Sequence, residues 1–388
     1  MRREDSLRVG IVGAGPVGIS AALFLENSGI SVTVLEAGTG LSAQSRASTF
    51  HPPTLEMLDQ AGVTDDLLAA GLIAQKVQWR DRRAGVVCEF DYSLLEGETK
   101  FPYRLQLEQS KLTQIIYERL VAHPLVEFRF DSKVDSVDGL AELLDARYVI
   151  GADGSHSSVR RSMGIEFEGT RYPDLYLVAL TSFDFQTVFK DLAYVNYVSD
   201  PEEWVSIFRT PGHWRATFPI DSRIAEKDIQ PEVQDRLRKL VTGVDSFPIE
   251  HAFVYQVHQR VASTFRHDRY LLAGDAAHVN NPMGGLGMNS GIHDAYFLTK
   301  QLTRILRDGQ RDSLLDDYSN VRRRVVTEYV NEDANRNWLL LREPDEEKRQ
   351  SELARLRGIA EDPKKAKEYV MRASMLESVS ATSAELSG

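Results

Sequence analysis

The first part of the chain alternates short apolar runs with a glycine-rich turn and an amphipathic stretch. An apolar run leads into the turn, a helical pattern follows, and a β-branched run then ends at Glu36. Strand, turn, helix and strand in this order predict one βαβ unit. The segments concerned are 7–12, 13–18, 19–27 and 31–35.

The residue composition changes in the second half of the chain. Residues 172–258 are rich in aromatic and β-branched residues separated by turn signals, which predicts a mostly antiparallel sheet, joined by 77–92. From residue 313 onward the chain reads as helical and heavily charged. We expect the serine-rich stretch after Ser374 to fray and the run Arg322–Arg324 to form a solvated helix face.

Composition limits the classes of partner. The 388 residues are 42% apolar and 27% charged, with a net charge of −11. This balance argues against a dedicated binder of nucleic acid or anionic membranes. Cys88 is the only cysteine, so no internal disulfide or multi-cysteine metal site is available, and we expect it to fill a strand. No bound metal is expected. The charged start and the lack of about 20 consecutive apolar residues favour a cytoplasmic protein without a membrane segment.

The turn Gly13-Ala14-Gly15-Pro16-Val17-Gly18 carries the first chemical signal. In a GxGxxG turn the first glycine permits the tight bend, the second lets a pyrophosphate touch the backbone, and the third lets helix and strand pack closely. Glu36 follows at the spacing expected of an acid that accepts hydrogen bonds from a ribose diol. The sequence therefore predicts dinucleotide binding.

Three further motifs repeat the pattern of strand end and turn. They are Arg46-Ala47-Ser48-Thr49, the segment from Gly151 to Arg160, and the segment from Gly274 to Gly291. Together with the first turn they resemble those of the single-component FAD-dependent aromatic hydroxylases. This group A of flavoprotein monooxygenases includes para-hydroxybenzoate hydroxylase. The resemblance spans about residues 7–300.

The resemblance implies an FAD site. The residue matching Asp275 holds the ribityl or ribose part of FAD, the loop Pro282–Met288 runs along the isoalloxazine ring, and the following helix begins near Met288 and Asn289. The implied cofactor-binding residues are Gly13, Gly15, Pro16, Val17, Gly18, Glu36, Arg46, Gln109, Asp153, Arg160, Gly274, Asp275, Pro282, Gly285, Leu286, Gly287, Met288 and Asn289.

The resemblance also implies an α/β fold and its division. We expect a Rossmann-like FAD-binding domain, an inserted mostly antiparallel substrate domain, and a helical C-terminal segment. The expected bounds are 1–75, 105–170 and 260–310 for the FAD-binding domain, 76–104 and 171–259 for the substrate domain, and 311–388 for the helical segment.

The implied reaction is hydroxylation of a small phenol-like aromatic or heteroaromatic substrate, with NADH or NADPH and O₂, through a flavin C4a-hydroperoxide. The chain has no second strand–GxGxxG–helix unit, so the nicotinamide is expected to dock transiently. Candidate substrate-pocket residues are Pro282, His51, Arg215 and Tyr194, with Thr49, His213 and Tyr197 beside them; His278 is expected to support the loop.

Several alternatives stay open at this level. A flavin-dependent halogenase shares the fold, but the stretch from Trp214 to Ile220 has a single Trp where a halogenase carries Trp-x-Trp. A ring-opening heterocycle oxygenase, a prenyl-lipid reductase, a ubiquinone-type hydroxylase and a non-catalytic flavoprotein are further candidates. The sequence does not separate a monomer from a homodimer.

Overall fold

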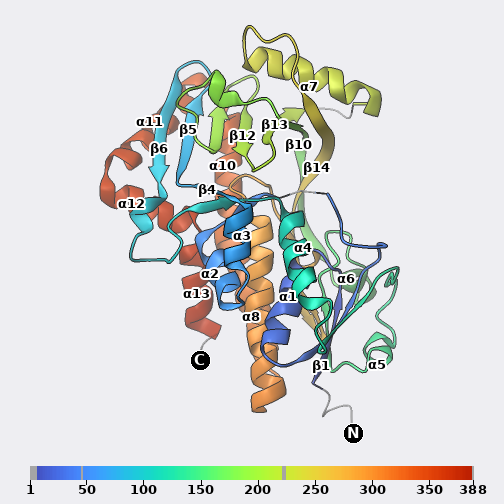
Figure 1. The fold of residues 1–388 in the computed structure, drawn as a ribbon. Coiled ribbons are helices and arrows are strands. Elements are labelled where there is room, and N and C mark those ends of the chain that lie inside the picture. The colour runs from blue at the N-terminus through green and yellow to red at the C-terminus, as the bar shows by residue number, and fades with distance from the viewer. Residues whose placement is uncertain (1–6, 45–46, 221–223, 387–388) are drawn as a thin grey trace.

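A computed structural model describes residues 7–44, 47–220 and 224–386. Its strands form two large sheets and one small one, with helices between and around them (Figure 1). The helices α11, α12 and α13 near the C-terminus run down the left side of the molecule in Figure 1. None of the helices in these ranges has the length and apolar character needed to span a bilayer.

The lower sheet in Figure 1 is doubly wound. Its described strands follow the order β15-β16-β9-β1-β2-β8, all parallel except the edge strand β15. In chain order the parallel strands therefore run 3-2-1-4-5, which is the Rossmann arrangement with its switch point between β1 and β9. The bounds are β1 (Arg8–Val12), β2 (Ser31–Leu35), β8 (Val126–Arg129), β9 (Tyr148–Gly151), β15 (Arg266–His267) and β16 (Tyr270–Leu272).

The upper sheet has the order β17-β14-β10-β13-β12-β11-β5-β6 among the described strands. It is antiparallel apart from the parallel pair β11 and β5. A small sheet, β3-β7-β4, lies between the two large ones. The bounds are β3 (Thr49–Phe50), β4 (Leu72–Ala74), β5 (Lys76–Asp81), β6 (Gly85–Asp91), β7 (Arg104–Gln106), β10 (Phe167–Thr181), β11 (Val195–Ser199), β12 (Val205–Arg209), β13 (Trp214–Ile220), β14 (Ile249–Ala262) and β17 (His278–Val279).

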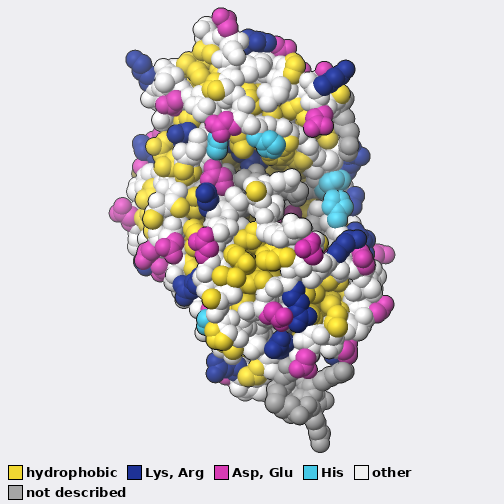
Figure 2. Space-filling view, turned by 45° about the vertical axis from the view of Figure 1, so that its right-hand side comes forward, with side chains coloured by type: hydrophobic (Ala, Val, Ile, Leu, Met, Phe, Trp, Pro, Cys, Tyr) yellow, Lys and Arg dark blue, Asp and Glu magenta, His cyan; other side chains and the backbone are white. Residues whose placement is uncertain are grey.

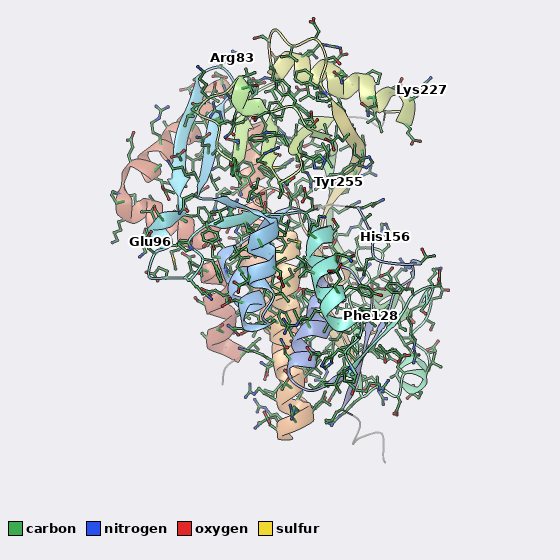
Figure 3. All side chains as sticks on the ribbon, viewed as in Figure 1. Arg83, Glu96, Phe128, His156, Lys227 and Tyr255 are labelled. Atoms are coloured by element: carbon green, nitrogen blue, oxygen red, sulfur yellow. The ribbon has the colours of Figure 1, made fainter. Side chains whose placement is uncertain are left out.

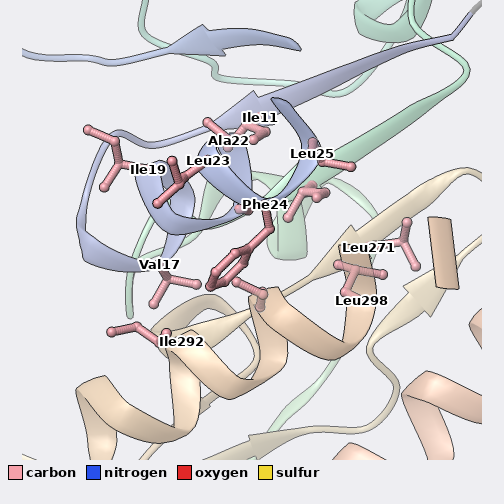
Figure 4. Packing of buried hydrophobic residues seen from close by; sticks show 14 of the residues in the cluster. Ile11, Val17, Ile19, Ala22, Leu23, Phe24, Leu25, Leu271, Ile292 and Leu298 are labelled. Atoms are coloured by element: carbon pink, nitrogen blue, oxygen red, sulfur yellow. The ribbon is translucent and has the colours of Figure 1, made fainter. Parts of the chain in front are cut away.

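Helices cover the lower sheet and line the C-terminal side. The central one is α8 (Gly287–Asp308), which packs its apolar face against α1 (Pro16–Asn27) and ends at Gly309. Figure 4 shows this packing, with Val17 and Phe24 of α1 directed toward α8. The remaining helices are α2 (Pro52–Gln60), α3 (Thr64–Ala70), α4 (Gln109–Leu120), α5 (Leu140–Leu143), α6 (Ser158–Ser162), α7 (Glu226–Leu240), α9 (Leu314–Val325), the π-helical turn η5 (Val326–Asn331), α10 (Glu332–Arg342), α11 (Glu346–Glu361), α12 (Pro363–Ala373) and α13 (Leu376–Leu386), with short 3₁₀ turns η2 (Tyr92–Leu95), η3 (Phe185–Thr187) and η4 (Gly274–Ala276).

The expected fold class is confirmed: a Rossmann-like domain, a mostly antiparallel inserted sheet, and a helical C-terminal segment. The C-terminal segment contributes to both cores, since Tyr318 packs with the lower sheet and Trp338 with the upper one. Cys88 lies buried in β6. The acidic and basic side chains are interspersed over the face seen in Figure 2.

The stretch 172–258 is mostly antiparallel sheet, as expected, and also contains the helix α7, whose buried Val233 and Leu237 are four residues apart. Two local expectations were wrong. The stretch after Ser374 is helical as far as Leu386 rather than frayed: α13 packs against α9 and buries Thr382 completely. Arg322 is 1% exposed rather than solvated, because its side chain reaches a buried carboxylate under the site.

Candidate functional site

The glycine turn after β1 lies at the switch point of the lower sheet, against the segment that follows β9. Gly13 has a φ of +103°, and a Cβ there would lie 2.5 Å from the Ala152 carbonyl oxygen. A Cβ at Gly18 would lie 1.9 Å from the Gly13 carbonyl oxygen. A Cβ at Gly15, in contrast, would meet no heavy atom within 4 Å beyond its chain neighbours. The turn is therefore closed on its inner side and open at Gly15. There α1 begins with Pro16, and the backbone N–H groups in the first turn of this helix are unpaired.

Glu36 sits at the end of β2 beside this turn. Its Oε2 accepts from the Ala14 amide at 2.8 Å, and its Oε1 accepts from the Gly38 amide at 2.9 Å. The carboxylate thus holds the turn to the strand end. Each oxygen keeps a lone pair, so a ribose hydroxyl can still donate to it.

The segment after β9 adds Asp153 and Arg160. Asp153 Oδ2 accepts from the Ser158 and Val159 amides at 2.7 and 3.2 Å and so caps α6. Asp153 Oδ1 is buried and has no hydrogen-bond partner among the described residues. Arg160 donates through Nη1 to the Ala276 carbonyl oxygen at 2.8 Å, which ties this segment to the turn after β16.

The turn after β16 packs against the first glycine turn through the side chain of Val17. A Cβ at Gly274 would lie 2.7 Å from Val17 Cγ2, and a Cβ at Gly291 would lie 2.6 Å from the same atom. Val17 and Ile292 of α8 lie close to each other in Figure 4. Between buried neighbours, Asp275 alone in the stretch 271–278 is exposed. Two segments more than 250 residues apart in sequence therefore pack on the same valine.

A buried ionic cluster supports this second turn from below. Asp294 Oδ2 accepts from the Gly274 amide at 3.0 Å and pairs with His278 Nε2 at 2.7 Å, while Oδ1 accepts from Arg322 Nε at 2.7 Å. Burial raises the pKa of Asp294, but the charges of His278 and Arg322 outweigh it and lower the pKa to about 2. The cluster is consistent with the supporting role expected of His278. Asp294 and Arg322 were missed in the sequence, where nothing distinguishes them from other charged helix positions.

The loop Pro282–Met288 is fixed by Asn289 at the start of α8. Asn289 Nδ2 donates to the Gly285 and Thr49 carbonyl oxygens at 2.7 and 2.8 Å, and its Oδ1 accepts from the His51 amide at 2.9 Å. A Cβ at Gly285 would lie 3.1 Å from Thr49 Cβ, so the backbone of the loop lies close to β3. Gly287 and Met288 form the first residues of α8 after Leu286.

His51 lies beneath the same loop. Burial, together with the nearby charge of Arg104, holds the pKa of His51 well below its usual range. The imidazole is therefore neutral, and its Nε2–H donates to the Gly284 carbonyl oxygen at 3.0 Å. This contact makes His51 a support of the loop backbone in the structure.

Two residues expected near the cofactor lie at the edge of the site. Gln109 Oε1 accepts from the Ala47 backbone amide at 3.2 Å, and the Gln109 backbone amide donates to the Ala47 carbonyl oxygen at 2.9 Å. Gln109 therefore anchors the segment that follows Arg46. Arg46 itself lies outside the described residues.

The residues expected to contact substrate are not all brought together. Arg215 is buried against Tyr255, which Figure 3 places where the upper sheet approaches the lower half. Tyr194 packs against Trp214, and His213 pairs with Glu250. Pro282 is half-buried at the start of the loop. Their roles in substrate binding stay predictions.

A cavity beside the loop is lined by one of the substrate-pocket candidates, Tyr197, and otherwise by residues that were not among them. Gly284, Leu286 and Tyr197 contribute from the loop and β11, and Arg104 contributes from β7. Sequence reasoning missed Arg104, because the short strand Arg104–Gln106 has polar residues at both ends and gives no sign that the arginine is buried. The full lining is Val77, Trp79, Phe90, Tyr92, Arg104, Tyr197, Gly284, Leu286, Asp333, Arg336, Asn337, Tyr369 and Ala373.

The described residues of the four motifs, which leave out only Arg46, form one surface at the carboxyl end of the lower sheet. The open glycine turn at a helix N-terminus suits a diphosphate, and the flat glycine loop at the start of α8 suits the edge of a flavin. The unpartnered Asp153 Oδ1 is an acceptor available to a ligand. The residues present therefore fit FAD, and the fold and site define a dinucleotide-binding flavoprotein.

Comparison with known proteins gives the family. The model of the family described as FAD binding domain matches residues 6–333, and the chain belongs to this family. The para-nitrophenol 4-monooxygenase of Pseudomonas sp. (strain WBC-3) is 33% identical over 353 residues, which cover 86% of this chain and 87% of the relative. The 6-hydroxy-3-succinoylpyridine 3-monooxygenase of Pseudomonas putida is 35% identical over 85% of this chain and 88% of the relative. A crystal structure of p-nitrophenol 4-monooxygenase from Pseudomonas putida has a TM-score of 0.87 at 30% identity, covering 96% of this chain and 97% of that one.

These findings confirm the class implied by the sequence resemblance. The protein is an FAD-dependent monooxygenase of the aromatic hydroxylase type, with a reduced nicotinamide and O₂ as co-substrates. The halogenase and non-catalytic alternatives are not favoured by these relatives.

Proposed function

We propose that this monooxygenase hydroxylates a small phenol or hydroxylated nitrogen heterocycle, bound in the cavity beside the Pro282–Met288 loop. The proposal rests on the lining of this cavity. Gly284 and Leu286 of the loop line it together with the aromatic side chains of Trp79, Tyr197 and Tyr369. A flat aromatic ring suits such a lining, because aromatic side chains pack favourably on its faces and edges. Relatives named for para-nitrophenol and for a hydroxypyridine support this substrate class.

The cavity is too small in the structure to hold an aromatic ring and must widen to admit one. Its free volume is about 20 Å³, enough for about one water molecule. A larger cavity of about 350 Å³ shares the lining residues Trp79, Arg336, Asn337 and Tyr369 with it. Because the two cavities share these side chains, we place the entry of the substrate between α10 and α12. The π-helical turn η5 directly precedes α10, and such turns are frequent at functional sites.

We assign the FAD-holding roles to the four motifs. The turn from Gly13 to Gly18 would take the diphosphate, Glu36 and Asp275 the sugar hydroxyls, and the loop before Asn289 the ring. When bound, FAD supplies the acceptance of hydride and the activation of O₂. The protein groups orient the substrate ring against the loop and exclude water from it.

Finer points follow from the sequence and stay predictions. They are the division into 1–75, 105–170 and 260–310, 76–104 and 171–259, and 311–388; a cytoplasmic location; and a monomeric or homodimeric state. A relative named as a probable NADH-specific resorcinol 4-hydroxylase, from Rhodococcus jostii, is 32% identical over 84% of this chain and 64% of the relative. It favours NADH as the reductant.

The test is a screen of the FAD-loaded protein. Oxidation of NADH and of NADPH is measured with and without each of a set of phenols and hydroxypyridines, and products are analysed by mass. We expect at least one compound to stimulate oxidation and to gain one oxygen atom, with any loss of nitrite or carbon dioxide read from the same spectrum. Halogenated products that form only when halide is present would contradict the proposal. It would also be contradicted if no phenol and no hydroxypyridine stimulated the oxidation of NADH or NADPH.

A further inference from the structure

Arg104 is a buried cation without a carboxylate partner among the described residues. Its side chain, in β7, is 4% exposed, and none of the ion pairs among the described residues includes it. Its Nε donates to the Tyr92 hydroxyl at 2.6 Å, and its guanidinium carbon lies 5.0 Å from the centre of the Tyr92 ring. The Tyr197 hydroxyl is a second neighbour. A further contact, from Nη2 to the Ala373 carbonyl oxygen, is long at 3.5 Å. A charge buried in this way is costly unless an anion accompanies it.

The tyrosine hydroxyls around the cavity are all used as acceptors. The Tyr92 hydroxyl accepts from Arg104, the Tyr197 hydroxyl accepts from the Gly284 amide at 3.0 Å, and the Tyr369 hydroxyl accepts from Trp79 Nε1 at 3.2 Å. Burial raises the pKa of Tyr92, Tyr197 and Tyr369, so each hydroxyl keeps its proton. Each proton is left to donate to a further acceptor.

The other charged residues of the lining do not neutralise Arg104. The Asp333 carboxylate accepts from Arg372 Nε at 2.7 Å and pairs with Arg336 at 3.0 Å, so its charge is already shared between two arginines. The nearby imidazole of His51 is neutral. The cavity therefore combines a positive balance with several hydrogen-bond donors and an aromatic wall.

We propose that Arg104, with the Tyr92 and Tyr197 hydroxyls, forms the subsite that binds an ionised oxygen on the ring of the aromatic substrate. This inference rests on the proposed function and specifies the charge of its substrate. The Tyr197 hydroxyl bonds both to the loop at Gly284 and to this cluster. An anion held here therefore fixes the ring beside the loop. Either a phenolate or an acidic substituent offers the required oxygen, and the experiment separates the two.

The test measures ligand binding to the FAD-loaded protein through changes in flavin absorbance. The probes are 4-nitrophenol at a mildly alkaline pH where it is ionised, 4-nitrobenzoate, and the uncharged 4-nitroanisole. They share the 4-nitrophenyl ring, are similar in size, and differ in charge. The wild-type protein is expected to bind one or both anions about tenfold to a hundredfold more tightly than the anisole, as for a charge-assisted hydrogen bond. The preferred anion shows whether the subsite takes a phenolate or a carboxylate.

Variants of Arg104 test the assignment. In Arg104→Met the preference for the anions should disappear while the binding of 4-nitroanisole stays within about threefold, since only one charge-assisted bond is lost. Arg104→Lys should restore part of the preference, because it keeps the charge but not the fork of donors. The matched control is Arg80→Gln, which removes a buried arginine of β5 that pairs with Asp191 and should leave the preference unchanged.

The results that would overturn the Arg104 subsite differ from those that would overturn the proposed function. An Arg104→Met protein that binds FAD and still prefers the anions as strongly as the wild type would overturn the subsite, and so would a wild type without preference. If Arg104→Met does not retain FAD, the double variant Tyr92→Phe with Tyr197→Phe decides, with a loss of preference of about tenfold expected. The proposed function is judged separately, by oxygenated product from the wild type.

Discussion

Replacing Arg322 by methionine removes the cation that accompanies Asp294 beneath the Gly274 turn. The side chains of Arg322 and Asp294 are 1% and 0% exposed, so the remaining carboxylate would stay buried with His278 as its only charge partner among the described residues. Breaking a buried pair from one side costs about 3–5 kcal/mol. This is a large part of the about 5–15 kcal/mol by which domains are stable. The neighbouring Arg324 is the matched control, because its pair with Glu385 is exposed on both sides and contributes only about 0–1 kcal/mol.

The pH dependence follows from the pKa of Asp294. Its value of about 2 in the folded protein lies below the ordinary value of 3.8. The ionised carboxylate therefore stabilises the native state above pH 3.8, by about 2 kcal/mol, and this contribution is lost as the pH falls from 3.8 through 2. Without Arg322, burial should raise the pKa, so that Asp294 becomes protonated more easily in the folded variant. The penalty of Arg322→Met should then be largest near neutral pH and shrink toward acid pH.

The assay is urea unfolding in excess FAD, followed by tryptophan fluorescence at a series of pH values, with the FAD content of each preparation measured. Arg322→Met should unfold at a lower urea concentration than Arg324→Met and should lose FAD, because Asp294 also holds the Gly274 amide. Adding Asp294→Asn to Arg322→Met should recover part of the stability. The reasoning is refuted if Arg322→Met and Arg324→Met behave alike, or if the penalty is the same at every pH.

Two further substitutions address the packing of the site. Gly291→Ala places a Cβ 2.6 Å from Val17 Cγ2 and should cost about 1–3 kcal/mol with weaker binding of FAD, whereas Gly358→Ala meets no atom within 4 Å in α11 and should be neutral or stabilising. Thermal unfolding and FAD titration compare the two, and equal behaviour would contradict the convergence at Val17. Truncation after Ser374 removes α13 and the Thr382 hydroxyl that accepts from the buried arginine at 3.0 Å, so it should lower the melting temperature and the FAD content. An unchanged truncated protein would instead support a frayed tail.

The fold and the cofactor motifs could be predicted because their signals are local. The turn from Gly13 to Gly18 needs small residues for reasons that act within a few positions, as the 1.9 Å approach of a Gly18 Cβ to the Gly13 oxygen shows. The spacing from turn to acid and the alternation of strand and helix are likewise readable in sequence. The family resemblance then joined motifs that the spacing alone leaves separate.

The remaining features depend on contacts between distant segments. Arg322 stands in a run of three arginines, and only the packing of α9 on α8 turns it inward to Asp294. The cavity at Arg104 is lined by side chains from β5, β7, β11, α10 and α12. No local sequence pattern indicates that these distant segments come together. The helix α7 was hidden by the aromatic and β-branched stretches around it, although Val233 and Leu237 repeat at helical spacing.

The central claim is that the turn at Gly13–Gly18 and the loop at Pro282–Met288 belong to a single FAD site. A crystal structure of the FAD-loaded protein tests it most directly. The account predicts one FAD per chain, with its diphosphate at Gly15 and the N-terminus of α1 and its ring along Gly285 and Leu286. An FAD bound elsewhere, or one whose ring lies away from that loop, would contradict it.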